Sequence, residues 1–147
     1  DIVMAGGYFI TGWGSTYFGG GRNPGPFAPA NPRNLDWEEN AQHIYQFFTA
    51  LNWWTLEPNH ELLSGSGTYF AIAYVGRQSV IYTRDTSDSI TLNLENADQP
   101  YTVKQFDPRT GTYTTLADHE DGTVVMLQPP DRQDWVFLIE RKLGSGE

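Results

Sequence analysis

The chain has 147 residues, enough for one ordinary domain or for one small domain and a fragment of another, and its 14% aromatic residues supply ample apolar surface for a core. A formal net charge of −9 argues against nucleic acid, an anionic membrane surface or a polyanionic ligand, because each requires clustered Lys and Arg. The absence of cysteine excludes disulfides, thiolate metal sites and thiol nucleophiles, and no apolar stretch approaches the roughly 20 residues needed to cross a bilayer.

The chain opens with glycine alternating with aromatic residues. Over residues 5–13 this pattern predicts a strand that opens into a loop. Residues 19–34 then hold so many prolines and glycines that no regular element can run through them. Residues 1–5 have neither the basic region of a signal peptide nor an initiator Met, so we expect the natural N-terminus to lie upstream.

One amphipathic helix is predicted after this loop. Asp36 and Glu39 have the spacing of a capping box, which favours a helix start at this point. Apolar residues then follow at helical spacing: Trp37, Ala41, Ile44, Tyr45, Phe48 and Leu51. We expect the helix to end near Trp53 and Trp54, because Pro58 cannot continue it.

Seven short β-rich runs follow a connector at residues 55–67. Glycine, proline and aspartate turns separate them at roughly regular spacing, which is typical of an antiparallel β-sandwich. The runs are residues 69–74, 79–84, 89–94, 101–106, 112–116, 123–127 and 135–140. The fold class we expect is therefore mainly β, an antiparallel β-sandwich of about seven strands preceded by one strand-loop-helix unit.

Within these runs, side-chain alternation and turn residues give finer expectations. In the run at 89–94, one face takes Ile90, Leu92 and Leu94 and the other takes Thr91 and Asn93. The first face is predicted to be buried and the second to be solvated. Residues 107–111 (DPRTG) and the pair Asp121 and Gly122 are both predicted to form tight hairpin turns.

Three segments carry a resemblance to a known family. They are residues 53–58 (WWTLEP) with 62–63 after them, residues 89–94 (SITLNL), and the pair 106–111 (FDPRTG) and 134–138 (DWVFL). In this order they resemble the C-terminal region of apiosidase-like glycoside hydrolases, whose last part is labelled a collagen-binding domain of a collagenase. The resemblance implies an extracellular or cell-surface protein.

The resemblance also implies how the chain is divided. Residues 5–13 and 37–51 would be the eighth strand and eighth helix of a (β/α)₈ barrel, within a terminal unit at 1–60, and residues 61–147 would be an accessory β-sandwich. A barrel needs eight such units to close. Family members carry their paired catalytic carboxylates on earlier strands, so we expect no catalytic residue in this chain.

The carboxylates of the chain agree with that expectation. Glycoside hydrolysis requires two carboxyl groups that face each other across the scissile bond. The candidates Glu38 and Glu39 are predicted to lie in the first helical turn, where a carboxylate interacts favourably with the helix dipole. Glu57 and Glu61 lie in the connector, where we expect them to be solvated.

Aromatic residues are the candidates for ligand contact. Trp13, Tyr17 and Phe18 follow the expected barrel strand, and aromatic rings can stack on sugar faces, so they are predicted substrate-binding residues of the intact enzyme. Simple packing is the alternative for these three. We expect Trp53 and Trp54 to pack in the seam between helix and sandwich. Four sandwich tyrosines are further candidates, with cross-strand packing as the favoured alternative: Tyr74, Tyr82, Tyr101 and Tyr113.

Nothing in the sequence predicts a metal site or a cofactor. His43, His60 and His119 are not at metal-ligand spacing. The acidic residues at 118–122 favour a solvated hairpin turn over a calcium site, because an EF-hand needs longer, ordered spacing.

Three functions remain open from the sequence. The first is an accessory module of a polysaccharide-degrading enzyme, with a glycan as ligand and an upstream barrel domain or a partner chain as neighbour. The second is a free-standing collagen- or glycan-binding adhesion module. The third is a structural subunit that associates, with itself or with another chain, through its exposed N-terminal unit.

Overall fold

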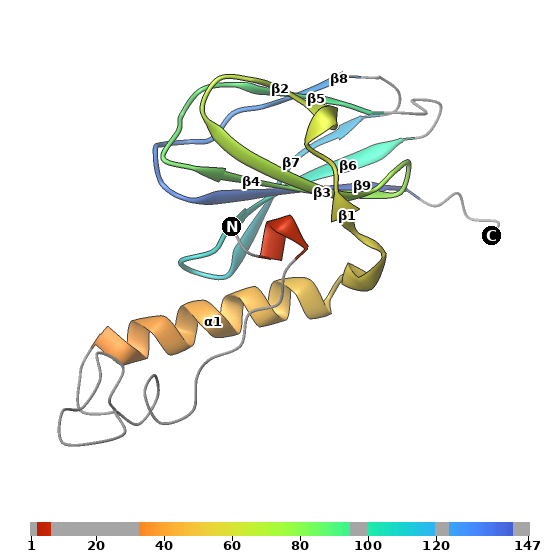
Figure 1. Ribbon diagram of the computed structural model, residues 1–147. Helices are drawn as coiled ribbons and strands as arrows, with labels where there is room; N and C mark the ends of the chain where they lie inside the picture. The colour runs from red at the N-terminus through yellow and green to blue at the C-terminus, as the bar shows by residue number, and fades with distance from the viewer. Residues whose placement is uncertain (1–2, 7–32, 95–99, 120–123, 143–147) are drawn as a thin grey trace.

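Two antiparallel β-sheets and one long helix make up the described part of the protein (Figure 1). The computed structural model describes residues 3–6, 33–94, 100–119 and 124–142, and over 33–40 the backbone alone. The larger sheet has the strand order β1 (Glu57–Pro58), β3 (Thr68–Tyr74), β4 (Gln78–Arg84), β9 (Trp135–Arg141), β6 (Tyr101–Asp107) and β7 (Thr112–His119). The smaller sheet has the order β2 (Leu63–Gly65), β5 (Ile90–Asn93) and β8 (Val124–Leu127). All seven predicted runs form strands, so the predicted sandwich is confirmed.

The helix α1 (Arg33–Thr49) begins three residues before the predicted start. The capping-box interpretation of Asp36 and Glu39 is therefore wrong, since both residues lie inside the helix. Glu38 and Glu39 accordingly lie in its second turn and not in its first. In the sequence a proline directly precedes Arg33, and proline is favoured at a helix start because its missing N–H has no helical partner to lose.

The helix also ends earlier than predicted. The Thr49 hydroxyl donates a hydrogen bond of 2.8 Å to the Tyr45 carbonyl oxygen, an arrangement that competes with helical bonding. The Leu51 amide then donates to the Phe48 carbonyl oxygen three residues back, at 3.0 Å, which tightens the last turn. A separate 3₁₀ helix, η2 (Trp53–Thr55), follows, so the chain turns toward β1 before the tryptophan pair.

The core between the two sheets is one apolar cluster. The alternation predicted for residues 89–94 is confirmed, since Ile90 and Leu92 are fully buried and Leu94 is 8% exposed. The larger sheet contributes Phe137, Ile81, Ile139, Val103, Ala71, Ala73 and Tyr101 to the same cluster. Each large side chain buried in this way stabilises the fold by about 1.5–3 kcal/mol, so this cluster holds the sheets together.

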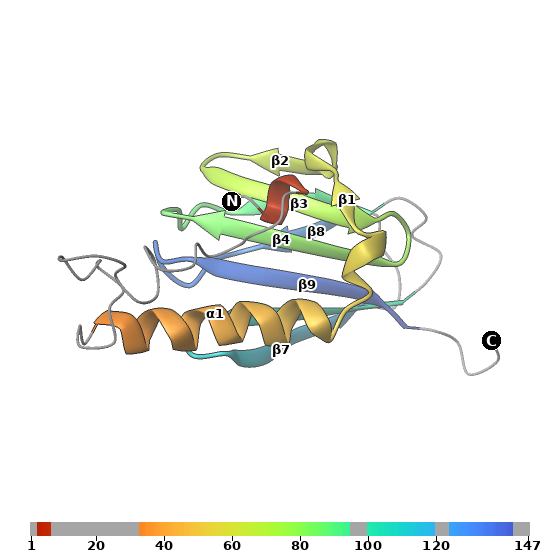
Figure 2. The ribbon, with the colours of Figure 1, turned by 60° about the horizontal axis from the view of Figure 1, so that its bottom comes forward.

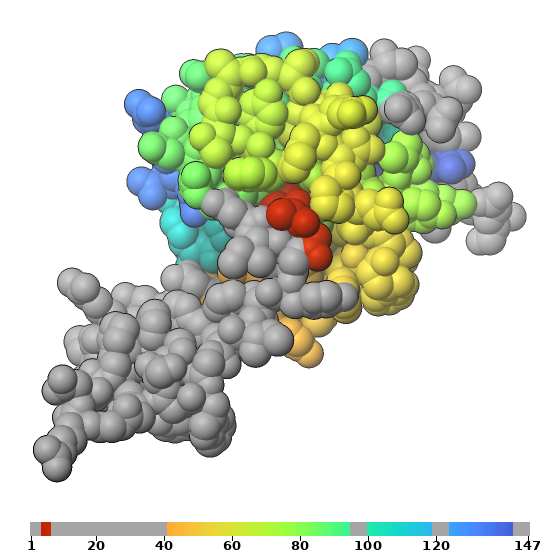
Figure 3. All heavy atoms as spheres, in the orientation of Figure 1, coloured from red at the N-terminus to blue at the C-terminus, as the bar shows by residue number. Residues whose placement is uncertain are grey.

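The opposite face of the larger sheet is apolar as well. It contributes Ile72, Val80, Phe106, Val136 and Leu138 to a second cluster, which α1 completes with Phe47 and Leu51. The helix runs along this face (Figure 2). The 3₁₀ helix η1 (Val3–Ala5) adds Met4 and lies against the segment that carries β1 (Figure 3). Ala5 and Gly6 are therefore not in a strand, and the rest of the strand predicted for 5–13, residues 7–13, lies outside the described residues.

Of the two predicted hairpins, one is confirmed and one is wrong. At 107–111 the amides of Thr110 and Gly111 donate to the Asp107 carbonyl oxygen at 3.3 and 2.9 Å, and Gly111 takes a φ of +69°. Asp121 and Gly122 lie outside the described residues, but β7 and β8 on either side of them belong to different sheets. β7 and β8 are therefore not the paired strands of a hairpin.

The connector contains two short strands that were not predicted. β1 pairs with β3 of the larger sheet and β2 pairs with β5 of the smaller one, so the connector passes from one layer to the other. Between them, in η3 (His60–Leu62), the His60 Nδ1 atom accepts a hydrogen bond of 3.0 Å from the Ala71 amide. Strands of two or three residues are too short to show an alternation of apolar and polar side chains. The sequence pattern therefore does not predict β1 and β2.

The helix is tied to the first hairpin by one side chain. The His43 Nδ1 atom donates to the Pro108 carbonyl oxygen at 3.2 Å, and a Cβ atom added to Gly111 would lie 2.7 Å from His43 Cδ2. No real Cβ contact is that short, so the hairpin can approach the helix because residue 111 is glycine.

We expect Gly111→Ala to lower the free energy of unfolding by about 1–2 kcal/mol from its left-handed backbone, with a further loss from the His43 ring. In a His43→Ala background only the backbone part should remain. Urea unfolding of the four proteins in this double-mutant cycle should give a coupling energy of at least about 0.5 kcal/mol. Strictly additive losses would show that the two residues are not in contact.

Tyr82 supplies a second test of the packing. Its hydroxyl donates to Asp134 Oδ2 at 3.0 Å. Burial, this hydrogen bond and the negative charge of Asp134 raise the pKa of Tyr82 from 10 to about 12. A pKa that is higher in the folded state stabilises the protein below pH 10, and this contribution is lost as the pH rises from 10 to 12.

Unfolding free energies measured across that interval should therefore fall more steeply for the native sequence than for Tyr82→Phe, which cannot ionise. Phenolate absorbance should show one fewer late-titrating tyrosine in the variant. Equal slopes for the two proteins would contradict the assignment.

Candidate functional site

The predicted substrate-binding residues Trp13, Tyr17 and Phe18 lie outside the described residues, and their role stays a prediction. The prediction that Trp53 and Trp54 pack in the seam is wrong. Their side chains are 41% and 67% exposed, and the two rings meet edge to face with centroids 6.1 Å apart. They are exposed because η2 turns the chain away from the helix before it reaches the sheet.

Two more large apolar residues are exposed on α1. Ile44 is 46% exposed and Tyr45 is 69% exposed, whereas Phe47 is buried in the cluster on the sheet. With 3.6 residues per turn, Tyr45 lies on the side of the helix away from Phe47. We call one group the exposed apolar residues of the helix side: Ile44, Tyr45, Trp53 and Trp54.

The four candidate tyrosines divide into two buried and two accessible residues. Tyr101 is 2% exposed in the inter-sheet core, and Tyr82 packs against the helix-side cluster with its hydroxyl bonded to Asp134. Tyr74 and Tyr113 are 48% and 45% exposed. Only the latter two, on β3 and β7, are placed to contact a ligand.

The polar candidates have structural partners or lie in solvent. His43 and His60 each use a ring nitrogen in a hydrogen bond to the backbone, to Pro108 and from Ala71 respectively. Glu57 and Glu61 are exposed. Within the described residues, no group of three or more His, Asp or Glu side chains is arranged to hold a metal ion.

The two halves of the third resemblance segment meet in space. The guanidinium group of Arg109 lies 4.8 Å from the centroid of the Trp135 ring, and Asp107 holds it through two hydrogen bonds of 2.8 and 2.9 Å. The bond from Arg109 lowers the pKa of Asp107. The indole nitrogen of Trp135 donates to Asp131 at 2.8 Å. Because one face of the ring is already covered, this cluster fastens the hairpin to β9 and is a poor platform for a ligand.

A row of polar side chains crosses the outer face of the larger sheet, on the side that also packs against α1. Its members stand in register on neighbouring strands: Gln78 of β4 opposite Glu140 of β9, Glu140 opposite Thr102 of β6, and Thr102 opposite Asp118 of β7. Lys104 and Lys142 join the row through ion pairs. These six residues are called the polar row.

The side chains of the polar row hold one another in place. Glu140 accepts hydrogen bonds from Gln78 Nε2 at 3.0 Å and from Lys104 Nζ at 2.8 Å. Asp118 accepts from the Thr102 hydroxyl at 2.9 Å and pairs with Lys142 at 3.0 Å. The side chains in the two ion pairs keep between 32% and 55% of their surface exposed, so they remain open to a ligand.

Two tyrosines flank the polar row. Tyr74 stands opposite Gln78 at the end of the same register. Tyr113, on β7, stacks on Phe47 of the helix, and burial together with the negative charge of Glu140 raises its pKa. The sequence did not single out this row, because alternation reveals which residues share a face of one strand but not which strands become neighbours.

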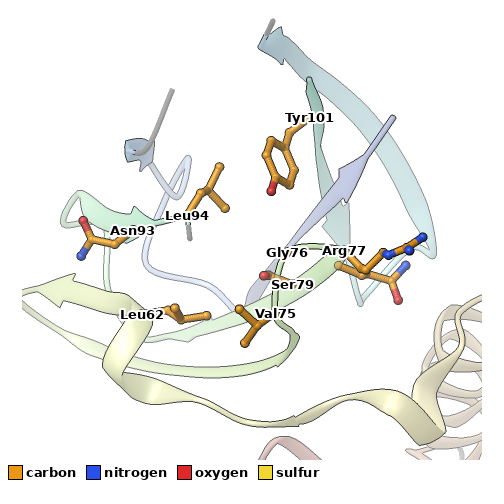
Figure 4. A pocket seen from close by; sticks show the side chains of 9 residues that line it. Leu62, Val75, Gly76, Arg77, Ser79, Asn93, Leu94 and Tyr101 are labelled. Atoms are coloured by element: carbon orange, nitrogen blue, oxygen red, sulfur yellow. The ribbon is translucent and has the colours of Figure 1, made fainter. Parts of the chain in front are cut away.

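A shallow depression lies at the opposite end of the inter-sheet core from the Trp135 cluster (Figure 4). It encloses about 250 Å³, part of it open to solvent, and is lined by residues that include Leu62, Leu94, Ser79 and Tyr101. The Tyr101 hydroxyl points into it, whereas the Arg77 side chain points away (Figure 4). Because much of this volume is open solvent, the depression is not a formed ligand pocket of the usual kind.

Over the part of the chain that the structure describes, no helix is both long and apolar enough to span a bilayer. No curated protein matches the chain in sequence.

Solved structures of glycoside hydrolases resemble the fold. One is a glycoside hydrolase, with a TM-score of 0.62 and 12% identity over 82% of this chain and 28% of that one. Another is a glycoside hydrolase family 5 protein from Bacteroides vulgatus, with a TM-score of 0.58 and 10% identity over 69% of this chain and 24% of that one. The chain thus spans about a quarter of the length of these structures.

The sequence profile of one protein family matches residues 65–140. That stretch runs from the end of β2 through β9 and so contains strands β3 to β8 and nearly all of β9, together with the Arg109 and Trp135 contact and most of the polar row. Since the match spans more than half of the chain, this protein belongs to the family described as "Putative collagen-binding domain of a collagenase".

Proposed function

We propose that this chain is the C-terminal part of a glycoside-hydrolase-like protein, of the apiosidase-like kind, and that it has no catalytic activity alone. Residues 61–147 form the accessory sandwich, and residues 1–60 are the last unit of a barrel whose other units carry the catalytic carboxylates. The likeness to the first glycoside hydrolase supports this division. It covers 82% of the chain, more than residues 65–140 can supply, so it extends into the segment before the family match.

The observation that carries the proposal is that apolar side chains on the helix side of the molecule face both the sheet and the solvent. Phe47 and Leu51 pack on the sheet, whereas Tyr45, Trp53 and Trp54 are directed to solvent. A helix with apolar residues on opposite sides is typical of one that packs between two layers. Exposed large apolar residues of this kind mark interaction surfaces.

The second layer, in this proposal, is the outside of a (β/α)₈ barrel. The helix α1 serves as its eighth helix, and the sandwich is then attached rigidly to the barrel. Trp13, Tyr17 and Phe18 contribute to the substrate site of the intact enzyme at the C-terminal face of the barrel, which is where barrel enzymes bind substrate. The ligand class of the accessory sandwich is a glycan, and the place of action is outside the cell.

Collagen binding by a free-standing module is the second candidate. It is favoured by one observation, the description of the family to which residues 65–140 belong. A family description does not establish a ligand, because function depends on the site and not on the fold. In a third arrangement, the exposed apolar residues of the helix side pair two copies of the chain, and light scattering that shows a stable monomer would exclude it.

Substitution of Trp54 tests the barrel contact. In the isolated chain, Trp54→Ser should change the free energy of unfolding by less than about 0.5 kcal/mol, because the ring is exposed. In the longer polypeptide that carries the upstream barrel, the same substitution should lower it by at least about 1.5 kcal/mol, since a buried aromatic ring is lost.

Met126→Ser is the matched control for this experiment. Met126 is 71% exposed on β8 of the smaller sheet, close to the 67% of Trp54, and its replacement should be silent in both proteins. An equally silent Trp54→Ser in the longer protein would contradict the docking surface. Glycoside cleavage by the isolated chain would contradict the assignment as a non-catalytic part.

Collagen binding is checked separately, by retention of the chain on immobilised fibrillar collagen at physiological salt. We expect no retention above that on immobilised serum albumin, because the polar row is made of polar side chains at its centre, whereas protein-binding hot spots are enriched in Trp, Tyr and Arg, and the exposed tryptophans are assigned to the barrel contact. Saturable retention on collagen would favour the second candidate.

A further inference from the structure

The polar row offers a ligand a prearranged set of hydrogen-bonding groups. The carboxylate of Glu140 is held by Gln78 and Lys104, yet two carboxylate oxygens have about four lone-pair positions, so Glu140 keeps capacity to accept more bonds, and Asp118 is held in place beside it by Thr102 and Lys142. Lys104 and Lys142 likewise have further N–H groups to donate. Groups that are already fixed lose little conformational entropy when a ligand binds.

The shape of the row limits the ligand to an extended one. The residues lie on a sheet face and follow its strands sideways from β4 through β9 and β6 to β7, with Tyr74 on the adjoining β3. With neighbouring strands about 4.8 Å apart, the row spans roughly 14 Å, and roughly 19 Å with Tyr74. That length fits a chain of several sugar units laid across the strands.

The charges of the row indicate a neutral ligand. The row contains two ion pairs, one between Glu140 and Lys104 and one between Asp118 and Lys142, so it has no net charge. The whole chain, in contrast, has a formal charge of −9. A polyanion would be repelled by the protein as a whole, and a polycation would gain nothing from this row in particular. Uncharged hydroxyl groups can both donate to the carboxylates and accept from the amide and ammonium groups.

The composition of the row argues against a protein partner. Binding hot spots between proteins are enriched in Trp, Tyr and Arg that fill desolvated pockets. The centre of the row is made of Gln, Glu, Lys, Thr and Asp, and its aromatic residues, Tyr74 and Tyr113, stand at the sides. An exposed tyrosine beside polar groups can instead pack on the C–H surface of a sugar ring.

We propose that the polar row is the binding site for a neutral polysaccharide chain, which rests on the proposed role of the sandwich as a glycan-binding accessory domain. Glu140 and Gln78 form its centre, and Tyr74 supplies the stacking surface. The site lies within one chain and does not involve the exposed apolar residues of the helix side, so glycan binding and docking on a barrel are separable.

Affinity electrophoresis of the 147-residue chain in native gels tests the site. The gels contain hydroxyethyl cellulose, galactomannan or arabinoxylan as neutral probes, and polygalacturonate as the anionic one. We expect retardation by at least one neutral polymer and none by polygalacturonate. Glu140→Ala and Gln78→Ala should each raise the dissociation constant for the retarding polymer by about tenfold, since each removes hydrogen bonds at the centre of the row.

Asp85→Asn is the matched control. Asp85 forms an exposed ion pair with Arg132 at 3.7 Å outside the row, and its replacement changes the net charge by the same amount as Glu140→Ala. Its dissociation constant should equal that of the native chain. Circular dichroism and unfolding midpoints establish whether each variant is folded. If Glu140→Ala does not fold, the dissociation constant of Gln78→Ala decides the test.

Several outcomes would overturn the proposal: no retardation by any neutral polymer, equal retardation of the native chain and both folded row variants, or retardation by polygalacturonate alone. Retention on collagen that is lost with Glu140→Ala would reassign the row to a protein. Trp54→Ser should leave retardation unchanged. Loss of glycan binding in that variant alone would move the site to the helix side, whereas failure of the docking test would leave the row unaffected.

Discussion

The larger sheet has to be covered on both faces, and the rest of the molecule follows from that requirement. One face carries Ile81, Phe137 and Ile139 into the inter-sheet core, and the other carries Val80 and Leu138 toward the helix. Apolar surface of this extent is stable only when it is removed from water. The smaller sheet covers the first face, and α1 with η1 covers part of the second. The part that the helix does not reach is polar, and it holds the candidate binding row.

The packing of the helix therefore stabilises the sandwich, although we propose that the same helix is also the last helix of a barrel. The Phe47 ring stacks on Tyr113 and contacts Phe106 at a tilt, and the His43 ring donates a hydrogen bond to the Pro108 carbonyl oxygen. These contacts fix α1 to the sandwich on one side, and Tyr45 is exposed on the other side of the helix. A shared helix gives two domains a fixed relative orientation, because neither can move without breaking the packing of the other. The proposed accessory role depends on this rigidity.

The family signature and the proposed binding surface occupy different parts of the same sheet. One end of the sandwich is closed by contacts among Arg109, Asp107 and Trp135. The segments that contain these residues therefore stabilise the fold. Glu140 and Asp118 lie toward the other end of strands β9 and β7, in a row that leaves much of its surface open. The row can thus change without disturbing the Arg109 and Trp135 contact, although most of it lies within the stretch that matches the family.

The sequence by itself determined the seven strands from β3 to β9, the buried face of residues 89–94 and the hairpin at 107–111, because these depend on local alternation and on turn residues. It did not determine the helix boundaries, since a proline and a tightened last turn outweighed the pattern around Asp36. Only the tertiary structure decided that β7 and β8 lie in different sheets, that Trp54 is exposed, and that Gln78, Glu140 and Asp118 form one row. These features depend on which strands become neighbours, and that is settled by the packing of whole layers rather than by any short stretch of residues.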